Sequence, residues 1–145
     1  MEVTARLGLP LLAVAQAGKE MTHNEALVTL DCAMQPVVEG EVSAPPVDPG
    51  LGQAWLIGGS PTGAFADHGG AIAVWTNGGW RFVAPFEGMA VWRLDAGVQA
   101  RRASSDWQSG APVSVPSGGA VVDIEARAVI ATIVARMREH GITAA

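Results

Sequence analysis

The sequence is short of several residue types, and each shortage excludes a class of protein. It has no Tyr, one Cys and one Lys among 145 residues. Charged residues make up only 16%, against roughly 25% in an ordinary soluble domain. Because 49% of the residues are hydrophobic, the chain is nevertheless predicted to fold rather than to stay disordered. Its length predicts one domain that folds on hydrophobic burial, without disulfides or metals.

The basic residues argue against nucleic acid as a partner. No more than two of the nine lie together, at Arg101 and Arg102, whereas proteins that bind nucleic acid carry a basic stripe that neutralises several phosphates. Seven acidic residues lie between Lys19 and Arg81 with no basic residue among them. We interpret this stretch as a solvated acidic edge; a partner with a basic patch, or a bound cation, is the alternative.

Long apolar runs are absent as well, so no membrane insertion is expected. Residues 7–15 are apolar, but Glu2 cancels the charge of Arg6, and Gly8 and Pro10 interrupt the run, so it is a poor secretory signal. Cys32 has no partner for an internal disulfide, and its apolar setting predicts a buried thiol in a protein that assembles in a reducing compartment.

The first two of three zones predict a helix followed by a small sheet. Thr22 and Glu25 have the spacing of a capping box, which predicts a helix over residues 23 to about 34, with an apolar face of Ala26, Leu27, Leu30, Ala33 and Met34. Short strands are predicted over residues 54–57, 71–75, 80–83, 90–94 and 98–101.

The hairpin signal Asn77-Gly78 pairs the second strand with the third and sets Trp75 opposite Trp80. We therefore expect an α+β fold, in which an N-terminal helix precedes a small antiparallel meander or barrel-like sheet with Trp-bearing hairpins.

The third zone predicts an amphipathic C-terminal helix between an Asp123 N-cap and a Gly141 terminator. Four apolar residues on it repeat at the 4,3,4 spacing that lets helices of several copies pack: Ala126, Ile130, Ile133 and Met137. The simpler use of this stripe is docking on the chain's own sheet, and packing between copies is its competitor. We divide the chain into residues 1–116, the helix and sheet, and residues 117–145, a linker and a helix for oligomerisation or docking.

Residues with catalytic potential form no recognisable set. His23, His68 and His140 stand apart from any nucleophile, and Asp67-His68 lacks further metal ligands nearby. We expect no enzymatic activity, no cofactor and no metal. Most of the five Trp are expected in the core; Trp107, in the polar run 104–109, is the best candidate for exposure and for stacking against a sugar ring.

Several segments together resemble a domain family of unknown function found in bacterial prophages and gene transfer agents, beside genes for tail fibres and other virion parts. The resemblance covers about residues 6–108 and is carried by residues 9–27, 58–65, 71–75, 79–82 and 85–92. It implies that the apolar start of the chain is retained. It carries no catalytic residues to transfer.

The resemblance implies a structural virion protein, assembled in the bacterial cytoplasm, that forms the base or adaptor of a host-attachment spike or tail fibre. Its partners would be further copies of itself and other virion proteins. A carbohydrate-binding module that recognises host surface polysaccharide through exposed Trp is the alternative function.

Overall fold

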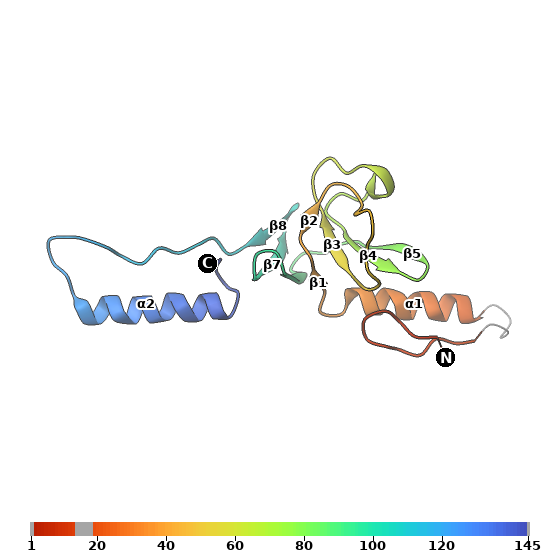
Figure 1. Cartoon of the computed structure of the whole chain (residues 1–145), viewed down its shortest axis with the longest axis horizontal. Helices are drawn as coiled ribbons and strands as arrows, with labels where there is room; N and C mark the ends of the chain where they lie inside the picture. The colour runs from red at the N-terminus through yellow and green to blue at the C-terminus, as the bar shows by residue number, and fades with distance from the viewer. Residues whose placement is uncertain (1, 14–18, 145) are drawn as a thin grey trace.

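Two sheets and two α-helices form the described part of the chain, residues 2–13 and 19–144 of a computed structural model (Figure 1). The first sheet contains, in spatial order, β1 (Val37–Val38), β6 (Ala90–Arg93), β7 (Val98–Ala103) and β8 (Asp106–Ser109). The second contains β2 (Glu41–Val42), β3 (Ala54–Ile57), β4 (Ile72–Thr76) and β5 (Gly79–Val83). The helices are α1 (Lys19–Ala33) and α2 (Ile124–Glu139), with a short 3₁₀ helix, η1 (Gly63–Phe65).

The predicted α+β fold is confirmed, with its strands divided between two sheets rather than joined in one barrel-like sheet. β1 pairs in parallel with β6, and β2 pairs in parallel with β3. The remaining pairs are antiparallel. The parallel strands have two residues each, too short to leave a periodic pattern in the sequence.

The predicted hairpin between β4 and β5 is confirmed. Thr76 pairs with Gly79, and the Thr76 hydroxyl donates to the Gly79 carbonyl at 2.7 Å. Trp75 lies opposite Trp80, with ring centroids 5.0 Å apart in an edge-to-face arrangement. Such a pair stabilises a hairpin by more than its buried area alone.

Buried side chains lie on both faces of the second sheet. One core cluster joins Cys32 of α1 to both sheets, for example through Leu56 and Val91. The other lies on the opposite face, where Phe65 of η1 packs edge-on to Trp80 with centroids 4.9 Å apart. The sheets are therefore held together by packing as well as by the chain that links them.

The start predicted for α1 is wrong, because the helix begins at Lys19 rather than at residue 23. Thr22 and Glu25 therefore lie within the helix and do not form its capping box. Glu25 instead forms an ion pair with Arg81 of β5.

The apolar face predicted for α1 is also wrong. Leu30 and Met34 are exposed, whereas Val28, Asp31 and Cys32 face the rest of the protein. Asp31 is only 2% exposed, and its carboxylate accepts hydrogen bonds from the Thr4 hydroxyl and from the backbone N–H groups of Arg6 and Leu7. A buried carboxylate is tolerated here because three donors satisfy it.

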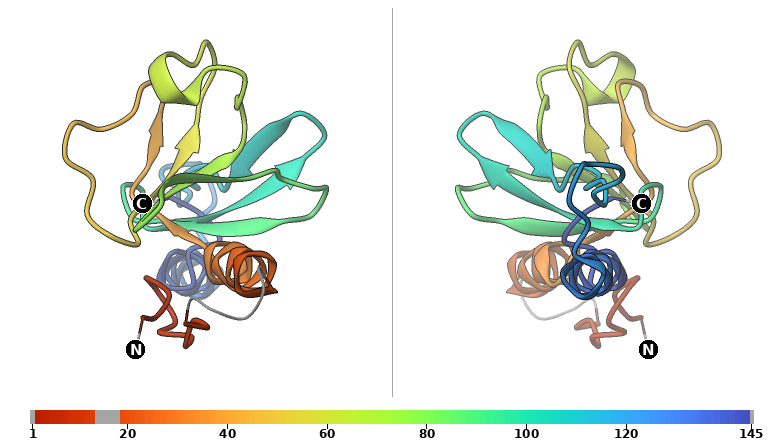
Figure 2. Two further views of the ribbon diagram at one scale, coloured as in Figure 1. Left: turned by 90° about the vertical axis from the view of Figure 1, so that its right-hand side faces the viewer. Right: turned by 90° about the vertical axis from the view of Figure 1, so that its left-hand side faces the viewer.

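α1 lies beneath the sheets, whereas α2 extends away from them to one side (Figure 1). Figure 2 looks along both helices and shows that their axes are nearly parallel lines, while Figure 1 shows that the chain runs along them in opposite directions. α2 makes no extensive contact with any described strand. Its apolar stripe therefore does not lie against the chain's own sheets, and the simpler expectation for this stripe is wrong.

Candidate functional site

Residues 111–140 leave the first sheet, form α2 and return to the sheet, and we call this segment the arm. It leaves the first sheet at Gly110, just after β8, and returns to the same place at Gly141. The carbonyl of Gly110 accepts from the N–H of Ala144 at 3.1 Å, and the carbonyl of Gly141 accepts from the N–H of Gln99 in β7 at 2.9 Å. The segments that flank the arm are thus hydrogen-bonded to each other and to β7.

The two ends of the arm meet at a place that we call the root, and two glycines allow the chain to pack closely there. A Cβ atom on Gly110 would lie 1.8 Å from the carbonyl oxygen of Ile142, far inside contact distance. A Cβ atom on Gly141 would lie 2.3 Å from Cζ3 of Trp92, and Gly141 has a φ of +64°. A side chain at either position would force the root apart. The sequence indicates Gly141 only as a helix terminator, and no local pattern in it points to Gly110 or Trp92.

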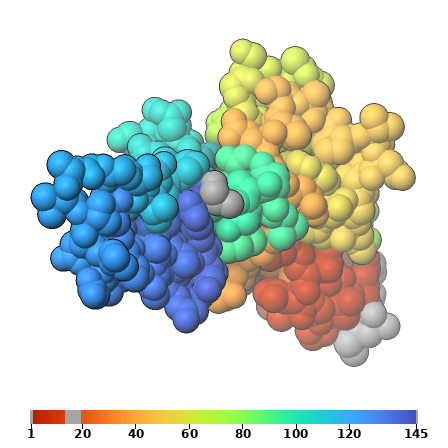
Figure 3. Space-filling view, turned by 60° about the vertical axis from the view of Figure 1, so that its left-hand side comes forward, coloured from red at the N-terminus to blue at the C-terminus, as the bar shows by residue number. Residues whose placement is uncertain are grey.

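The extended half of the arm, which we call the strap (residues 111–122), runs alongside α2. The guanidinium of Arg127 donates to the carbonyls of Pro116 and Gly118, and that of Arg138 donates to the carbonyl of Val113. Figure 3 shows the strap against the helix in the blue part of the molecule. The predicted N-cap is confirmed, since Asp123 accepts from the N–H of Ala126 at 2.8 Å.

The four residues predicted for an oligomer interface lie together on α2, beside the flank that the strap covers. Ile130 is 41% exposed and Ile133 53% exposed; Ala126 is exposed and Met137 is half-buried. Val129, also exposed, extends the patch, whereas Val134 is buried toward the strap flank. An apolar stripe on a protruding arm is therefore available for contact with another protein. Its role as an oligomer interface stays a prediction.

Trp107 is not the exposed Trp that its polar neighbours predict. It is half-buried on β8, packs against the core, and donates its indole N–H to the carbonyl of Gly70 at 2.9 Å. Trp92 of β6 is instead the exposed Trp, beside the root of the arm. Polar neighbours failed as a signal because β8 is an edge strand whose alternate residues face solvent.

A groove of about 330 Å³ lies beside Trp107, between the β7–β8 hairpin and the loops of the second sheet. Arg102, whose guanidinium carbon is 6.0 Å from the centre of the Trp107 ring, lines it together with Glu41, Ser60 and Asp106. The groove thus combines an aromatic surface with charged and hydroxyl groups. Contact of Trp107 with a glycan stays a prediction.

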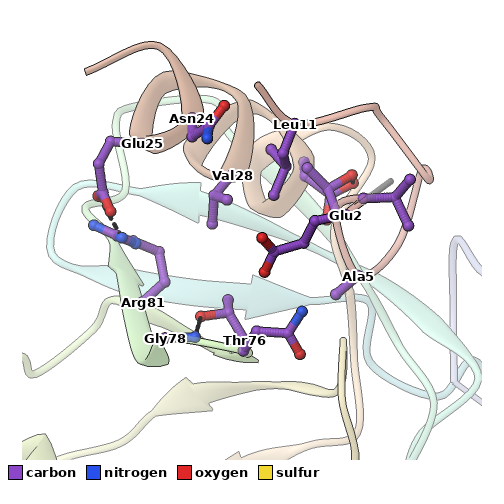
Figure 4. A pocket seen from close by; sticks show the side chains of 13 residues that line it. Glu2, Ala5, Leu11, Asn24, Glu25, Val28, Thr76, Gly78 and Arg81 are labelled. Carbon is purple, nitrogen blue, oxygen red and sulfur yellow. Dashed lines mark hydrogen bonds and ion pairs between the residues drawn. The ribbon is translucent and has the colours of Figure 1, made fainter. Parts of the chain in front are cut away.

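A second, smaller pocket of about 200 Å³ lies between the N-terminal segment, α1 and the β4–β5 turn (Figure 4). The ion pair between Glu25 and Arg81 closes one side, and Glu2 points in from the other. Asp31 also lines it, but its carboxylate is already engaged by the N-terminal segment. Asp31 thus holds that segment on α1, and the Glu25–Arg81 pair joins α1 to β5.

His68 and Cys32 are further candidates for metal binding or nucleophilic chemistry. In residues 2–13 and 19–144, no three His, Cys, Asp or Glu side chains lie close enough together to hold a metal ion. His68 stacks on Phe82 with ring centroids 3.7 Å apart. Cys32 is buried, as predicted, and burial followed by the charge of Asp31 raises the pKa of its thiol to about 11. Such a thiol is a poor nucleophile.

The described helices are each too short or too polar to cross a bilayer. No curated protein matches the sequence. A family model described as a protein of unknown function, DUF2793, matches residues 23–108, which include most of α1 and all of the described strands except the last residue of β8, but not the arm. This match spans more than half of the chain, and the protein therefore belongs to the DUF2793 family of proteins of unknown function.

Proposed function

We propose that the chain is a structural subunit of a phage-like particle, where it forms the base or adaptor of a host-attachment spike or tail fibre. The arm is the observation that carries the proposal. Soluble monomers rarely leave a continuous apolar stripe on a protruding helix, because such a surface is stabilised by contact with another protein. The phage-like setting rests on the sequence resemblance to prophage and gene-transfer-agent proteins. The proposal places the protein in the virion after assembly in the bacterial cytoplasm.

The anchoring of the arm supports a role in assembly. Its two ends are hydrogen-bonded at Gly110 and Gly141, and the strap is bound to α2 through Arg127 and Arg138. A surface that is already ordered loses little conformational entropy on binding. The arm is thus suited to a permanent structural contact, with further copies of the chain as the first candidates.

Aspartate substitutions in the stripe test the assembly role. In Ile130→Asp/Ile133→Asp, two exposed apolar side chains become charged, so the oligomer should dissociate while the sheets stay folded. The control is Thr132→Asp/Ala135→Asp, which adds the same charges at the same spacing on the opposite side of α2, where both residues are exposed. Both variants lose similar helix propensity, so only contact through the stripe separates them.

Mass measurement in solution and analysis of purified particles provide the readout. Wild type and control should form the same oligomer, and Ile130→Asp/Ile133→Asp should be a monomer with an unchanged circular dichroism spectrum. A wild-type chain that stays monomeric at every concentration and is missing from isolated particles contradicts the proposal.

The groove beside Trp107 favours a second candidate, a carbohydrate-binding module for host surface polysaccharide. Sugar sites combine an aromatic face with a few well-placed polar groups, and Trp107, Arg102 and Asp106 supply that combination. Titration with capsular polysaccharide tests it, comparing Asp106→Ala with the control Asp48→Ala, which removes another exposed carboxylate away from the groove. Loss of binding in Asp106→Ala alone supports the module, and no binding by wild type at high sugar concentration excludes it.

A further inference from the structure

The stripe on α2 matches a second copy of itself running in the opposite direction. We propose that two chains associate by antiparallel pairing of their α2 helices, an inference that rests on the proposed assembly role of the arm. In this pairing Ala126 faces Met137 of the second copy, and Ile130 faces Ile133 of the second copy. Three independent features of the arm support it: side-chain size, charge and the position of the root.

Side-chain size favours the antiparallel arrangement. The stripe has a small residue, Ala126, at the N-terminal end and a large one, Met137, at the C-terminal end, with Ile130 and Ile133 between them. Antiparallel pairing gives four layers of similar total volume, because each small side chain meets a large one. Parallel pairing gives one layer of two Ala and another of two Met, which leaves a gap at one end and crowding at the other.

Charge favours the same arrangement. Glu125 lies in the first turn of α2 and Arg136 in the last. Because eleven residues make almost a whole number of helical turns, the two side chains leave the helix within about 20° of each other around its axis, on one flank of the stripe. Antiparallel pairing therefore brings each Glu125 to Arg136 of the second copy and also opposes the helix dipoles. The existing ion pair of Arg136 with Glu139 is exposed, so it is a weak competitor.

The opposite flank of α2 is already occupied. Arg127 and Arg138 are bound to strap carbonyls, and Val134 is buried on this side. The strap thus leaves the stripe and the Glu125–Arg136 flank free for a partner.

The position of the root also favours antiparallel pairing. The C-terminal end of α2 joins the sheets, and its N-terminal end points away from them (Figure 1). Antiparallel pairing places the two sheet bodies at opposite ends of the helix pair. Parallel pairing brings both bodies to one end, at the roughly 8–10 Å spacing of packed helices.

Disulfide cross-linking distinguishes the two directions. Cys32 is fully buried, so cysteines introduced on α2 are the accessible ones. In the antiparallel pair, position 126 lies opposite position 137 of the second copy. It is displaced by about 16 Å along the helix axis from position 126 of the second copy, beyond the reach of a disulfide. Ala126→Cys and Met137→Cys should each stay uncross-linked alone. Mixed in equal amounts, they should give a cross-linked dimer under mild oxidation; the control Ala135→Cys, on the opposite face, should give none with either.

The outcomes separate this inference from the proposed function. If Ala126→Cys cross-links efficiently to itself, the helices pair in parallel, and the direction is wrong although self-association holds. If wild type is a monomer but binds a different virion protein through the stripe, the second copy is the wrong partner although the assembly role holds. If wild type is a monomer that is absent from particles, both proposals fail.

Charge reversal gives a second readout. Arg136→Glu should weaken the dimer about two- to tenfold, since it replaces two exposed ion pairs with two repulsive ones. Glu125→Arg/Arg136→Glu should restore the affinity. A double variant no better than Arg136→Glu would contradict the antiparallel contact.

Discussion

The indole of Trp92 occupies the space that a side chain on Gly141 would fill, with Cζ3 only 2.3 Å from the position of a Cβ atom. Trp92 belongs to β6 and Gly141 follows α2, so this contact joins the end of the arm to the middle of the first sheet. The backbone contact between Gly110 and Ile142 lies at the same root and is tighter still. Close packing at these two glycines therefore joins the C-terminal end of the arm to the first sheet.

Gly110→Ala should loosen the root of the arm. The new methyl group meets the carbonyl of Ile142, a backbone atom that cannot rotate away, so the segment after α2 must move. We expect a loss of about 1–3 kcal/mol in the free energy of unfolding, with faster hydrogen exchange at the amides of Gln99 and Ala144. Denaturant unfolding and hydrogen exchange measure the two effects.

The matched control is Gly59→Ala, at an exposed glycine with open space around its Cβ position. It should leave both amides protected as in wild type. Equal exchange in Gly110→Ala and Gly59→Ala would show that the root does not depend on close approach.

Asp31→Ala should release the N-terminal segment from α1. It removes the acceptor for the Thr4 hydroxyl and for the N–H groups of Arg6 and Leu7, leaving buried or half-buried donors unpaired. The Arg6 guanidinium, which donates to the carbonyls of Asp31 and Gln35 at the end of α1, should then also lose its fixed position. We expect a loss of about 2–4 kcal/mol, because each unpaired buried donor costs about 1–3 kcal/mol and partial hydration recovers some of it.

Limited proteolysis after Arg6, together with thermal unfolding, measures this release. Asp48→Ala is the control, since Asp48 is an exposed acid. Cleavage of Asp31→Ala no faster than that of Asp48→Ala would contradict the role of Asp31.

Regular patterns predict the strands β3 to β7 and the helix α2 well, but they miss β1, β2 and β8. The two-residue strands are too short for a pattern, and long-range contacts explain the other errors. β3 was predicted residue for residue, and the caps of α2 were found, because turn and cap signals are local. α1 was misread because its buried face includes Asp31, a charge that sequence patterns assign to solvent. The return of the chain from Gly141 to Gly110 was missed because nothing local distinguishes a glycine that allows close approach from one in a turn.

The Cys32 thiol should react slowly with alkylating agents and should make stability depend on alkaline pH. Its pKa rises from 9.0 to about 11, chiefly through burial, so the folded protein holds about 100-fold less thiolate below pH 9 than a free thiol. Between about pH 9 and pH 11 the unfolded chain loses a proton that the folded chain keeps, so the free energy of unfolding falls as the pH rises.

Cys32→Ala is the control for this pH dependence, because it removes the thiol and leaves the other titrating groups in place. The difference in unfolding free energy between wild type and Cys32→Ala should change in favour of the variant over that pH range. A constant difference, or rapid alkylation of the native protein at pH 8, would mean that the thiol is not held in a buried environment.

Trp107→Phe should separate the packing role of Trp107 from its hydrogen bond. Phe keeps an aromatic ring against the core but lacks the indole N–H that donates to the carbonyl of Gly70, the contact that ties β8 to the second sheet. We expect a loss of about 1–2 kcal/mol, from the unpaired carbonyl and the smaller ring. Trp107→Ala should cost clearly more, about 3–5 kcal/mol, because it also empties the space beside the core. Urea unfolding of the two variants measures both losses, and equal losses would show that the ring contributes nothing beyond its N–H.

Since Trp107→Ala disturbs the fold, loss of sugar binding in that variant would not identify a glycan contact. The exposed Asp106 allows that test without removing core packing.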